Sequence, residues 1–156
     1  MHRRRWPVIV AAVAVAALLS ILLYTLLASH QPASDHSSNT PSGAADRVDV
    51  VYFHRTQRCY SCLYVETGAR HTVEDYFEDE LASGTVTFQT VNVQDQANGD
   101  IVRKYGAYTS SLFVNTIKDG ADHIEEATEV YFLIGRDEAF VEALKSRIEK
   151  SLNGEA

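Results

Sequence analysis

Apolar residues follow three patterns along the chain, and each predicts a different kind of element. Residues 8–27 form an uncharged apolar run, residues 48–53 form a short run rich in valine and aromatic residues, and later segments show helical or alternating spacing. A helix rises about 1.5 Å per residue and a bilayer core is about 30 Å thick, so the first run predicts a helix that crosses a membrane once. The second run predicts a central strand that is buried on both faces.

The remaining patterns predict an α/β domain. Apolar residues three and four apart predict a helix after residue 62 that ends at Ser83-Gly84. The elements expected next are a strand over 86–93, a short helix over 95–105, a hairpin of strands 112–117 and 122–128 with its turn at Asp119-Gly120, and a helix from Arg136-Asp137. Residues 129–135 fit either a strand end or a helical turn. The order β-α-β-α-β-β-α predicts a three-layer sandwich with helices on both faces of one sheet.

The first 28 residues predict a membrane anchor or a signal peptide. Arg3, Arg4 and Arg5 precede the apolar run, and positive charge of this kind stays in the cytoplasm, so the chain after residue 28 is expected outside it. Small residues in "LLASHQPA" would suit signal cleavage, but the run is longer than the usual apolar region of a signal peptide. We therefore expect a single-pass protein of the cell membrane with an extracytoplasmic domain.

Composition divides the rest of the chain into a linker and one domain. Residues 29–46 are rich in serine, with proline and glycine, and lack apolar periodicity, which predicts a flexible linker. Residues 47–156 have the length of one domain with a modest core. All 21 acidic residues but only 11 of the 14 basic ones follow the apolar run, which gives this part a net charge of −10. So acidic a domain is not expected to bind nucleic acid.

The two cysteines of the chain, Cys59 and Cys62, lie between the first predicted strand and the helix that follows it. A thiolate is the nucleophilic form of cysteine, and a thiol with a pKa of about 8.5 is mostly protonated at neutral pH. A position in the first turn of a helix would stabilise the thiolate of Cys59 through unpaired backbone N–H groups and the helix dipole. Arg58 and His54 in the same loop are further candidates for lowering its pKa.

Three roles for the cysteine pair follow from this pattern. In a redox role, Cys59 attacks a partner disulfide and Cys62, one turn further along the helix, resolves the mixed disulfide, so the partners are protein thiols or disulfides. In a structural role the pair forms a permanent bridge, although so short a loop gives little stabilisation. In a metal role His54 and His71 complete the ligand set, but one C-x-x-C without paired histidines is a weak zinc signal, so no metal is expected.

The residues around the cysteines resemble those of a known family. The strand "VVYFH", a short loop and C-Y-S-C at the start of a helix resemble thioredoxin-fold redox domains. The segments "YFHRTQRCYSC" with Glu66, "VNV" and "YTSSLFV" are similar to a membrane-anchored thioredoxin-like family, nitrophenyl compound nitroreductase subunit ArsF, over most of residues 48–150. The resemblance implies a thioredoxin-like fold. The chain contains no flavin or nicotinamide motif, so no cofactor is expected and a link to nitroreduction would make it an accessory thiol subunit.

Three features depart from the thioredoxin pattern, and one of them is that Tyr60 and Ser61 replace the familiar Gly-Pro between the cysteines. Phe53 stands six residues before the first cysteine, where thioredoxins carry a buried acid. Glu66 is a candidate for proton transfer if it is buried, although a helix carboxylate is more often solvated. Ser110 or Ser111 occupies the place of the cis-proline that faces the disulfide in thioredoxins. These serines are therefore expected to contact the partner, but with a backbone geometry that differs from that of thioredoxins.

These features together predict a membrane-tethered, extracytoplasmic thiol-disulfide oxidoreductase that acts with a membrane electron donor or acceptor. The alternative is a non-catalytic thioredoxin-like binding module or accessory subunit of a membrane redox complex, in which the C-x-x-C pair is a structural disulfide.

Overall fold

The computed structural model describes residues 43–155. The predicted anchor or signal at residues 1–28 and the predicted linker up to residue 42 lie outside the described residues. Within the described part, no helix is both long and apolar enough to cross a membrane. The end of the predicted linker contacts the domain, because the N–H of Ala45 donates to the carbonyl of Leu152 at 3.0 Å and that of Asp46 donates to Ile117 at 2.8 Å. Contacts with the domain therefore begin before residue 47.

The order of elements is the predicted β-α-β-α-β-β-α, with short additional helices. The elements are β1 (Arg47–His54), α2 (Tyr60–Tyr76), α3 (Glu78–Ser83), β2 (Val86–Asn92), η1 (Gln96–Asn98), α4 (Gly99–Tyr105), β3 (Ser111–Lys118), β4 (Ala121–Glu126), η2 (Thr128–Leu133) and α5 (Asp137–Leu152). Asp119 and Gly120 both have positive φ, as expected for a tight hairpin turn between β3 and β4.

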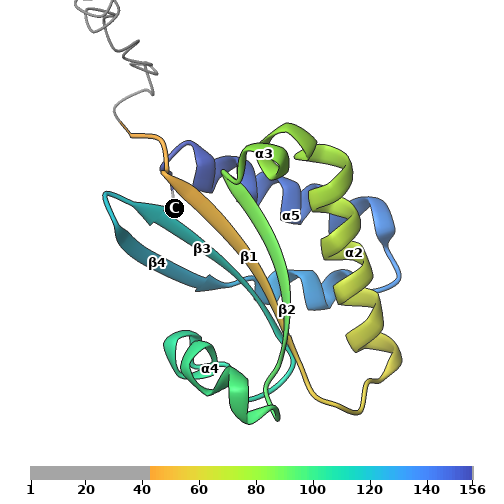
Figure 1. Cartoon of the computed structure of the whole chain (residues 1–156). Coiled ribbons are helices and arrows are strands. Elements are labelled where there is room, and N and C mark those ends of the chain that lie inside the picture. The colour runs from red at the N-terminus through yellow and green to blue at the C-terminus, as the bar shows by residue number, and fades with distance from the viewer. Residues whose placement is uncertain (1–42, 156) are drawn as a thin grey trace, which may run out of the picture. The chain divides into compact units, whose positions relative to one another are not determined.

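The four strands form one sheet in the order β2-β1-β3-β4 (Figure 1). Strand β1 pairs in parallel with β2 and antiparallel with β3, and β4 pairs antiparallel with β3. The prediction that residues 48–53 form a central strand is confirmed. The C-terminal ends of β1 and β2 therefore lie side by side, and α2 starts from that edge of the sheet.

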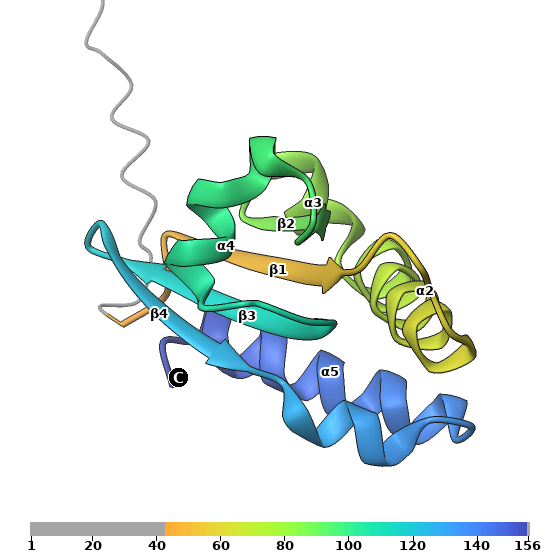
Figure 2. The ribbon, with the colours of Figure 1, turned by 90° about the horizontal axis from the view of Figure 1, so that it is seen from below.

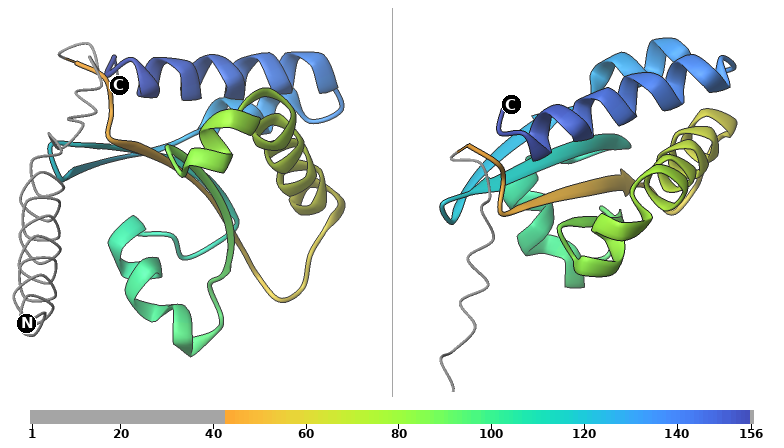
Figure 3. Two further views of the ribbon diagram at one scale, coloured as in Figure 1. Left: turned by 45° about the horizontal axis from the view of Figure 1, so that its top comes forward. Right: turned by 90° about the horizontal axis from the view of Figure 1, so that it is seen from above.

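Helices cover both faces of the sheet, as the sequence predicted. Figures 2 and 3 show α2 and α5 on one face and α4 on the other. Successive residues of β1 alternate between two apolar clusters: Val50 and Tyr52 face α2 and α5, whereas Val51 and Phe53 face α4. This alternation explains why the strand reads as continuously apolar.

Two segments differ in detail from the prediction. The long helix predicted after the cysteines is divided at Phe77, whose φ of −133° and ψ of 36° are not helical and whose side chain is buried. The second piece, α3, ends at Gly84 in the left-handed conformation, as predicted. The strand predicted over 122–128 ends earlier, because β4 stops at Glu126 and the short helix η2 begins at Thr128. Of the two alternatives for residues 129–135, the structure has the helical turn.

Helices α2 and α5 approach closely at Gly68. A Cβ atom at this position would lie 2.7 Å from Cε1 and 3.0 Å from Cδ1 of Phe140, a buried residue of α5. The absence of a side chain at Gly68 thus lets the Phe140 ring pack against the backbone of α2.

We expect Gly68→Ala to destabilise the protein even though alanine is the better helix former. The helix propensity gain is about 1 kcal/mol, whereas overpacking typically costs about 1–3 kcal/mol. Urea denaturation of the full-length chain measures the difference. In a Phe140→Leu background the overpacking should disappear, and the same substitution should become neutral or stabilising. A stabilising effect of Gly68→Ala in the wild-type background would contradict this packing.

Candidate functional site

The cysteine pair lies where the β1–α2 loop enters the helix. Cys59 is the N-cap of α2, with extended backbone angles, and its carbonyl accepts from the N–H of Leu63 at 3.1 Å. The Cys59 side chain is exposed and that of Cys62 is half-buried, and both cysteines are free. The expected difference in exposure between the two thiols is confirmed.

The two sulfur atoms interact directly. Sγ of Cys59 lies 2.8 Å from Sγ of Cys62 and 3.0 Å from Oγ of Ser61. Hydrogen bonds from Cys62 and Ser61, together with backbone N–H groups of the first helical turn, lower the pKa of the Cys59 thiol from its ordinary value to about 7. A much larger share of Cys59 is therefore thiolate at neutral pH than in an ordinary cysteine.

Arg58 and Glu66 form an ion pair with each other. Both side chains are largely buried, at 23% and 17% exposure, and Arg70 approaches the other oxygen of Glu66 at 3.5 Å. The guanidinium of Arg58 also lies 5.8 Å from the centre of the Tyr52 ring. The structure therefore brings these two predicted residues together, on the side of α2 that faces the end of β1. The ion pair holds the loop before Cys59 against the helix.

A tyrosine that the sequence analysis did not single out lies beneath the cysteine helix. The buried hydroxyl of Tyr52 donates to the carbonyl of Cys62 at 2.8 Å, and burial raises the pKa of Tyr52 to about 12. The neighbouring Phe53 points to the opposite face and packs against Tyr105 and Phe113 at 5.3 and 5.6 Å between ring centres. The side chain of β1 that contacts the first turn of α2 is therefore the uncharged phenol of Tyr52. A buried hydroxyl needs a hydrogen-bond partner, so a tyrosine within the predicted buried strand was the sequence signal that could have identified Tyr52.

Of the two serines predicted to contact a partner, Ser110 lies at the cysteine pair. Its Oγ is 3.6 Å from Sγ of Cys62. Ser111 begins β3, is buried, and donates its hydroxyl to the carbonyl of Thr109 at 3.2 Å. The peptide bonds of the described chain are all trans, so Ser110 faces the pair without the cis bond of a cis-proline.

The two histidines considered as metal ligands lie in different surroundings. His54, at the end of β1, has its Nδ1 atom 3.0 Å from the carbonyl of Arg55, and its ring stacks near Tyr52. His71 pairs with Asp75 on α2 at 3.0 Å. Between residues 43 and 155, no group of three or more histidine, cysteine or acidic side chains is close enough to hold a metal ion.

Large apolar side chains are exposed near both segments of the site. Tyr60, between the cysteines, is 75% exposed, and Tyr108, shortly before Ser110, is 76% exposed. Leu63, directly after Cys62, is half exposed. Exposed apolar residues at a reactive thiol are typical of a surface that contacts a partner.

Comparisons with known proteins returned few matches. No protein family model and no curated protein sequence matches the chain. Among solved structures, the solution structure of a thioredoxin from Thermus thermophilus is 19% identical, with a TM-score of 0.42, covering 67% of this chain and 76% of that one. A structure described as that of a malarial protein is 16% identical, with a TM-score of 0.35, covering 58% of this chain and 97% of that one.

The architecture itself fits a thioredoxin-like fold. A mixed sheet in the order β2-β1-β3-β4, with the cysteine-bearing helix following β1, has the element order of the thioredoxin core. The resemblance to the ArsF family rests on the quoted sequence segments and stays a prediction.

We expect the alkylation rate of Cys59 by iodoacetamide to rise with pH and to reach half its maximum near pH 7. Cys62→Ala removes the largest cause of the low pKa and should move this midpoint upward, and Ser61→Ala should move it upward by less. Peptide mass spectrometry resolves the modified residue. Thr67→Ala, further along the helix, is the matched control and should keep the wild-type midpoint. A wild-type midpoint near pH 9 would contradict the geometry.

The same pKa shift links protonation to folding. The folded-state pKa of Cys59 lies below its ordinary value of 9.0, so the unfolded chain binds more protons between about pH 7 and 9. This contribution to the stability of the reduced protein is complete above about pH 9 and is lost as the pH falls through about 7.

Proposed function

We propose that this chain is a thiol-disulfide oxidoreductase that acts on protein partners through Cys59 and Cys62. The observation that carries the proposal is the contact of two free thiols at the start of a helix, with the outer thiol exposed and its pKa lowered to about 7. This combination supplies an accessible nucleophile and a second sulfur within reach of it.

The reaction is a two-electron exchange. The Cys59 thiolate attacks one sulfur of a partner disulfide, a mixed disulfide forms, and the other partner sulfur leaves as a thiolate. Cys62 then loses its proton and attacks Sγ of Cys59, so the remaining partner sulfur leaves as a thiolate. The partner is reduced to a dithiol while Cys59 and Cys62 become a disulfide. The reverse sequence oxidises a partner dithiol.

A neutral hydroxyl lies beside the sulfur of Cys62 during the second step. The Ser110 hydroxyl, 3.6 Å away, donates to the sulfur when it becomes a thiolate. Tyr52 keeps its proton because its pKa is about 12, and it holds the turn through the Cys62 carbonyl. The carboxylate of Glu66 is paired with Arg58 and Arg70. The Cys62 proton therefore passes to solvent or to the departing partner thiolate.

The sequence supports a proposed location for this reaction. Residues 8–27 serve as the tether and Arg3, Arg4 and Arg5 stay in the cytoplasm, so the domain works on the extracytoplasmic side of the cell membrane. Its partners are protein thiols or disulfides and a membrane electron donor or acceptor, and the exchange needs no cofactor. The segments similar to the ArsF family support a role as a thiol subunit of a membrane redox complex.

A second candidate is a non-catalytic binding module with a structural disulfide. The observation that favours it is the presence of binding surface away from the thiols, because Phe132 of η2 is 81% exposed and β4 is an edge strand whose side chains, mostly polar, are exposed. Such a module would bind a partner by its surface whether or not the cysteines are present.

We expect Cys59→Ser to abolish the reduction of insulin disulfides by the full-length chain in the presence of dithiothreitol, while circular dichroism shows an unchanged fold. The serine hydroxyl is not ionised at neutral pH and forms no disulfide, so the first step is lost. Equal activity of the wild type and the variant would refute the enzymatic proposal and leave the binding module.

We expect Cys62→Ser to accumulate mixed disulfides between Cys59 and its partners, because the thiol that resolves them is missing. Non-reducing electrophoresis of cells treated with acid and alkylating agent detects these species as bands that disappear on reduction. The double variant Cys59→Ser/Cys62→Ser is the matched control and should show none. Absence of such bands, with Cys59 still reactive to iodoacetamide, would contradict the two-step exchange.

A further inference from the structure

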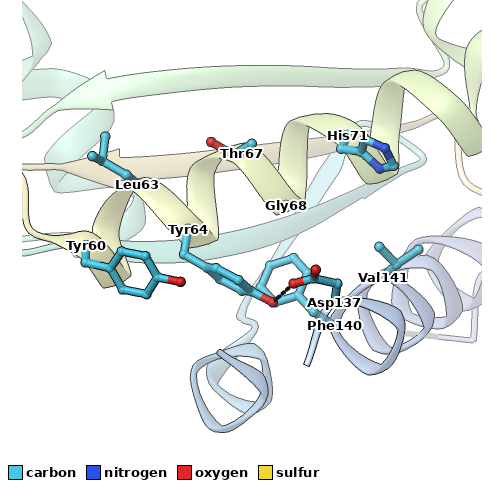
Figure 4. A pocket seen from close by; sticks show the side chains of 9 residues that line it. All are labelled: Tyr60, Leu63, Tyr64, Thr67, Gly68, His71, Asp137, Phe140 and Val141. Atoms are coloured by element: carbon cyan, nitrogen blue, oxygen red, sulfur yellow. Dashed lines mark hydrogen bonds between the residues drawn. The ribbon is translucent and has the colours of Figure 1, made fainter. Parts of the chain in front are cut away.

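An apolar groove runs between α2 and the start of α5. It has a volume of about 580 Å³, which is in the range of sites that bury a compact ligand or several side-chain groups. Figure 4 shows Tyr60, Tyr64 and His71 on α2, with Phe140 and Val141 on α5. Leu63, Thr67, Gly68 and Asp137 complete the lining.

The close approach of the two helices forms the walls of this groove. The ring of Tyr64 packs edge-on against Phe140 at 5.7 Å and stands beside Tyr60 at 6.2 Å. Its hydroxyl donates to Oδ1 of Asp137 at 2.5 Å. These contacts hold α2 and α5 at the spacing that Gly68 permits and keep the groove open between them.

Three of the polar side chains in the lining have partners within the protein. The Tyr64 hydroxyl and Asp137 bind each other, and His71 pairs with Asp75 outside the groove. The lining contains no lysine or arginine. A charged occupant would therefore lose hydration against a mostly apolar lining, whereas an apolar occupant would gain contact area.

The groove adjoins the cysteine pair through two residues of its lining. Tyr60 lies between Cys59 and Cys62 in the sequence, Leu63 directly follows Cys62, and both line the groove while remaining at least half exposed. A polypeptide with its sulfur at Cys59 thus places its neighbouring residues at the mouth of the groove.

We propose that the groove binds a large apolar side chain of the same partner segment that carries the sulfur attacked by Cys59. This inference rests on the proposed function and specifies its substrate class: disulfides flanked by an aromatic or large aliphatic residue. The groove occupant is released with the partner thiolate when Cys62 resolves the mixed disulfide.

The test compares peptide disulfides as substrates of the full-length reduced protein. Each substrate is a disulfide-linked homodimer of one heptapeptide, so attack at either sulfur gives the same products. One peptide leaves as a thiolate while the other is bound to Cys59; Cys62 then releases the second peptide as a thiolate, and the protein pair becomes a disulfide. Phenylalanine or serine is placed at each position within three residues of the cysteine. Oxidised glutathione is the small substrate that does not reach the groove.

Two variants fill the groove and one serves as the matched control. Thr67→Trp and Val141→Trp place a large ring in it from α2 and α5, respectively. Glu74→Trp adds the same ring at an exposed position of α2 that does not line the groove.

We expect phenylalanine in at least one position to raise kcat/KM about tenfold or more over serine, as burial of an aromatic side chain predicts, mainly through KM. Both filling variants should lose this gain and keep the wild-type rate with oxidised glutathione, and Glu74→Trp should keep both. Equal rates for phenylalanine and serine peptides, or a gain that persists in both filling variants, would overturn the groove proposal while leaving thiol exchange intact. Failure of the wild type to react with any disulfide, glutathione included, would overturn the proposed function and the groove proposal with it.

Discussion

The burial of β1 on both faces is the constraint on which the rest of the structure depends. Alternate side chains of this strand fill two separate cores, one against α2 and α5 and the other against α4. The strand is therefore held by hydrogen bonds from β2 and β3 and by apolar contacts above and below. The C-terminal end of β1 is therefore held in place, and the short loop that follows it positions Cys59 at the start of α2.

The chemistry of the site comes from local geometry more than from strong charges. Arg58 and Glu66 form an ion pair with each other, and hydrogen bonds from Cys62, Ser61 and the helix N-terminus favour the Cys59 thiolate. These donors are present only when the first turn of α2 is formed. The Tyr52 hydroxyl contributes to this by binding the Cys62 carbonyl from below. Thiol reactivity is thus coupled to the order of one helical turn.

The features that the sequence predicted are those governed by short-range pattern. The central strand, the hairpin turn at Asp119-Gly120 and the relative exposure of Cys59 and Cys62 follow from apolar spacing and from the position of the cysteines before a helix. The break at Phe77 was missed because helical spacing continues across it, and only packing shows that the backbone turns there.

The residues missed around the site depend on contacts between distant segments. Tyr52 sits in an apolar run that does not reveal which face each residue takes, and its partner is ten residues away in another element. The pairing of Arg58 with Glu66 depends on how the loop folds back onto α2. The groove requires α5 to pack on α2 at Gly68, and no local pattern encodes that approach.

The aromatic cluster of Phe53, Tyr105 and Phe113 has a consequence for how this domain can change over evolutionary time. A buried acid at the position of Phe53 would serve chemistry at the expense of folding stability. Here three rings pack within 5.6 Å of one another between the sheet and α4. In this layer, the requirements of folding stability therefore do not oppose those of activity. Substitutions in this layer change the stability of the fold. The residues around the cysteines can meanwhile vary to suit new partners, because the layer keeps the domain folded.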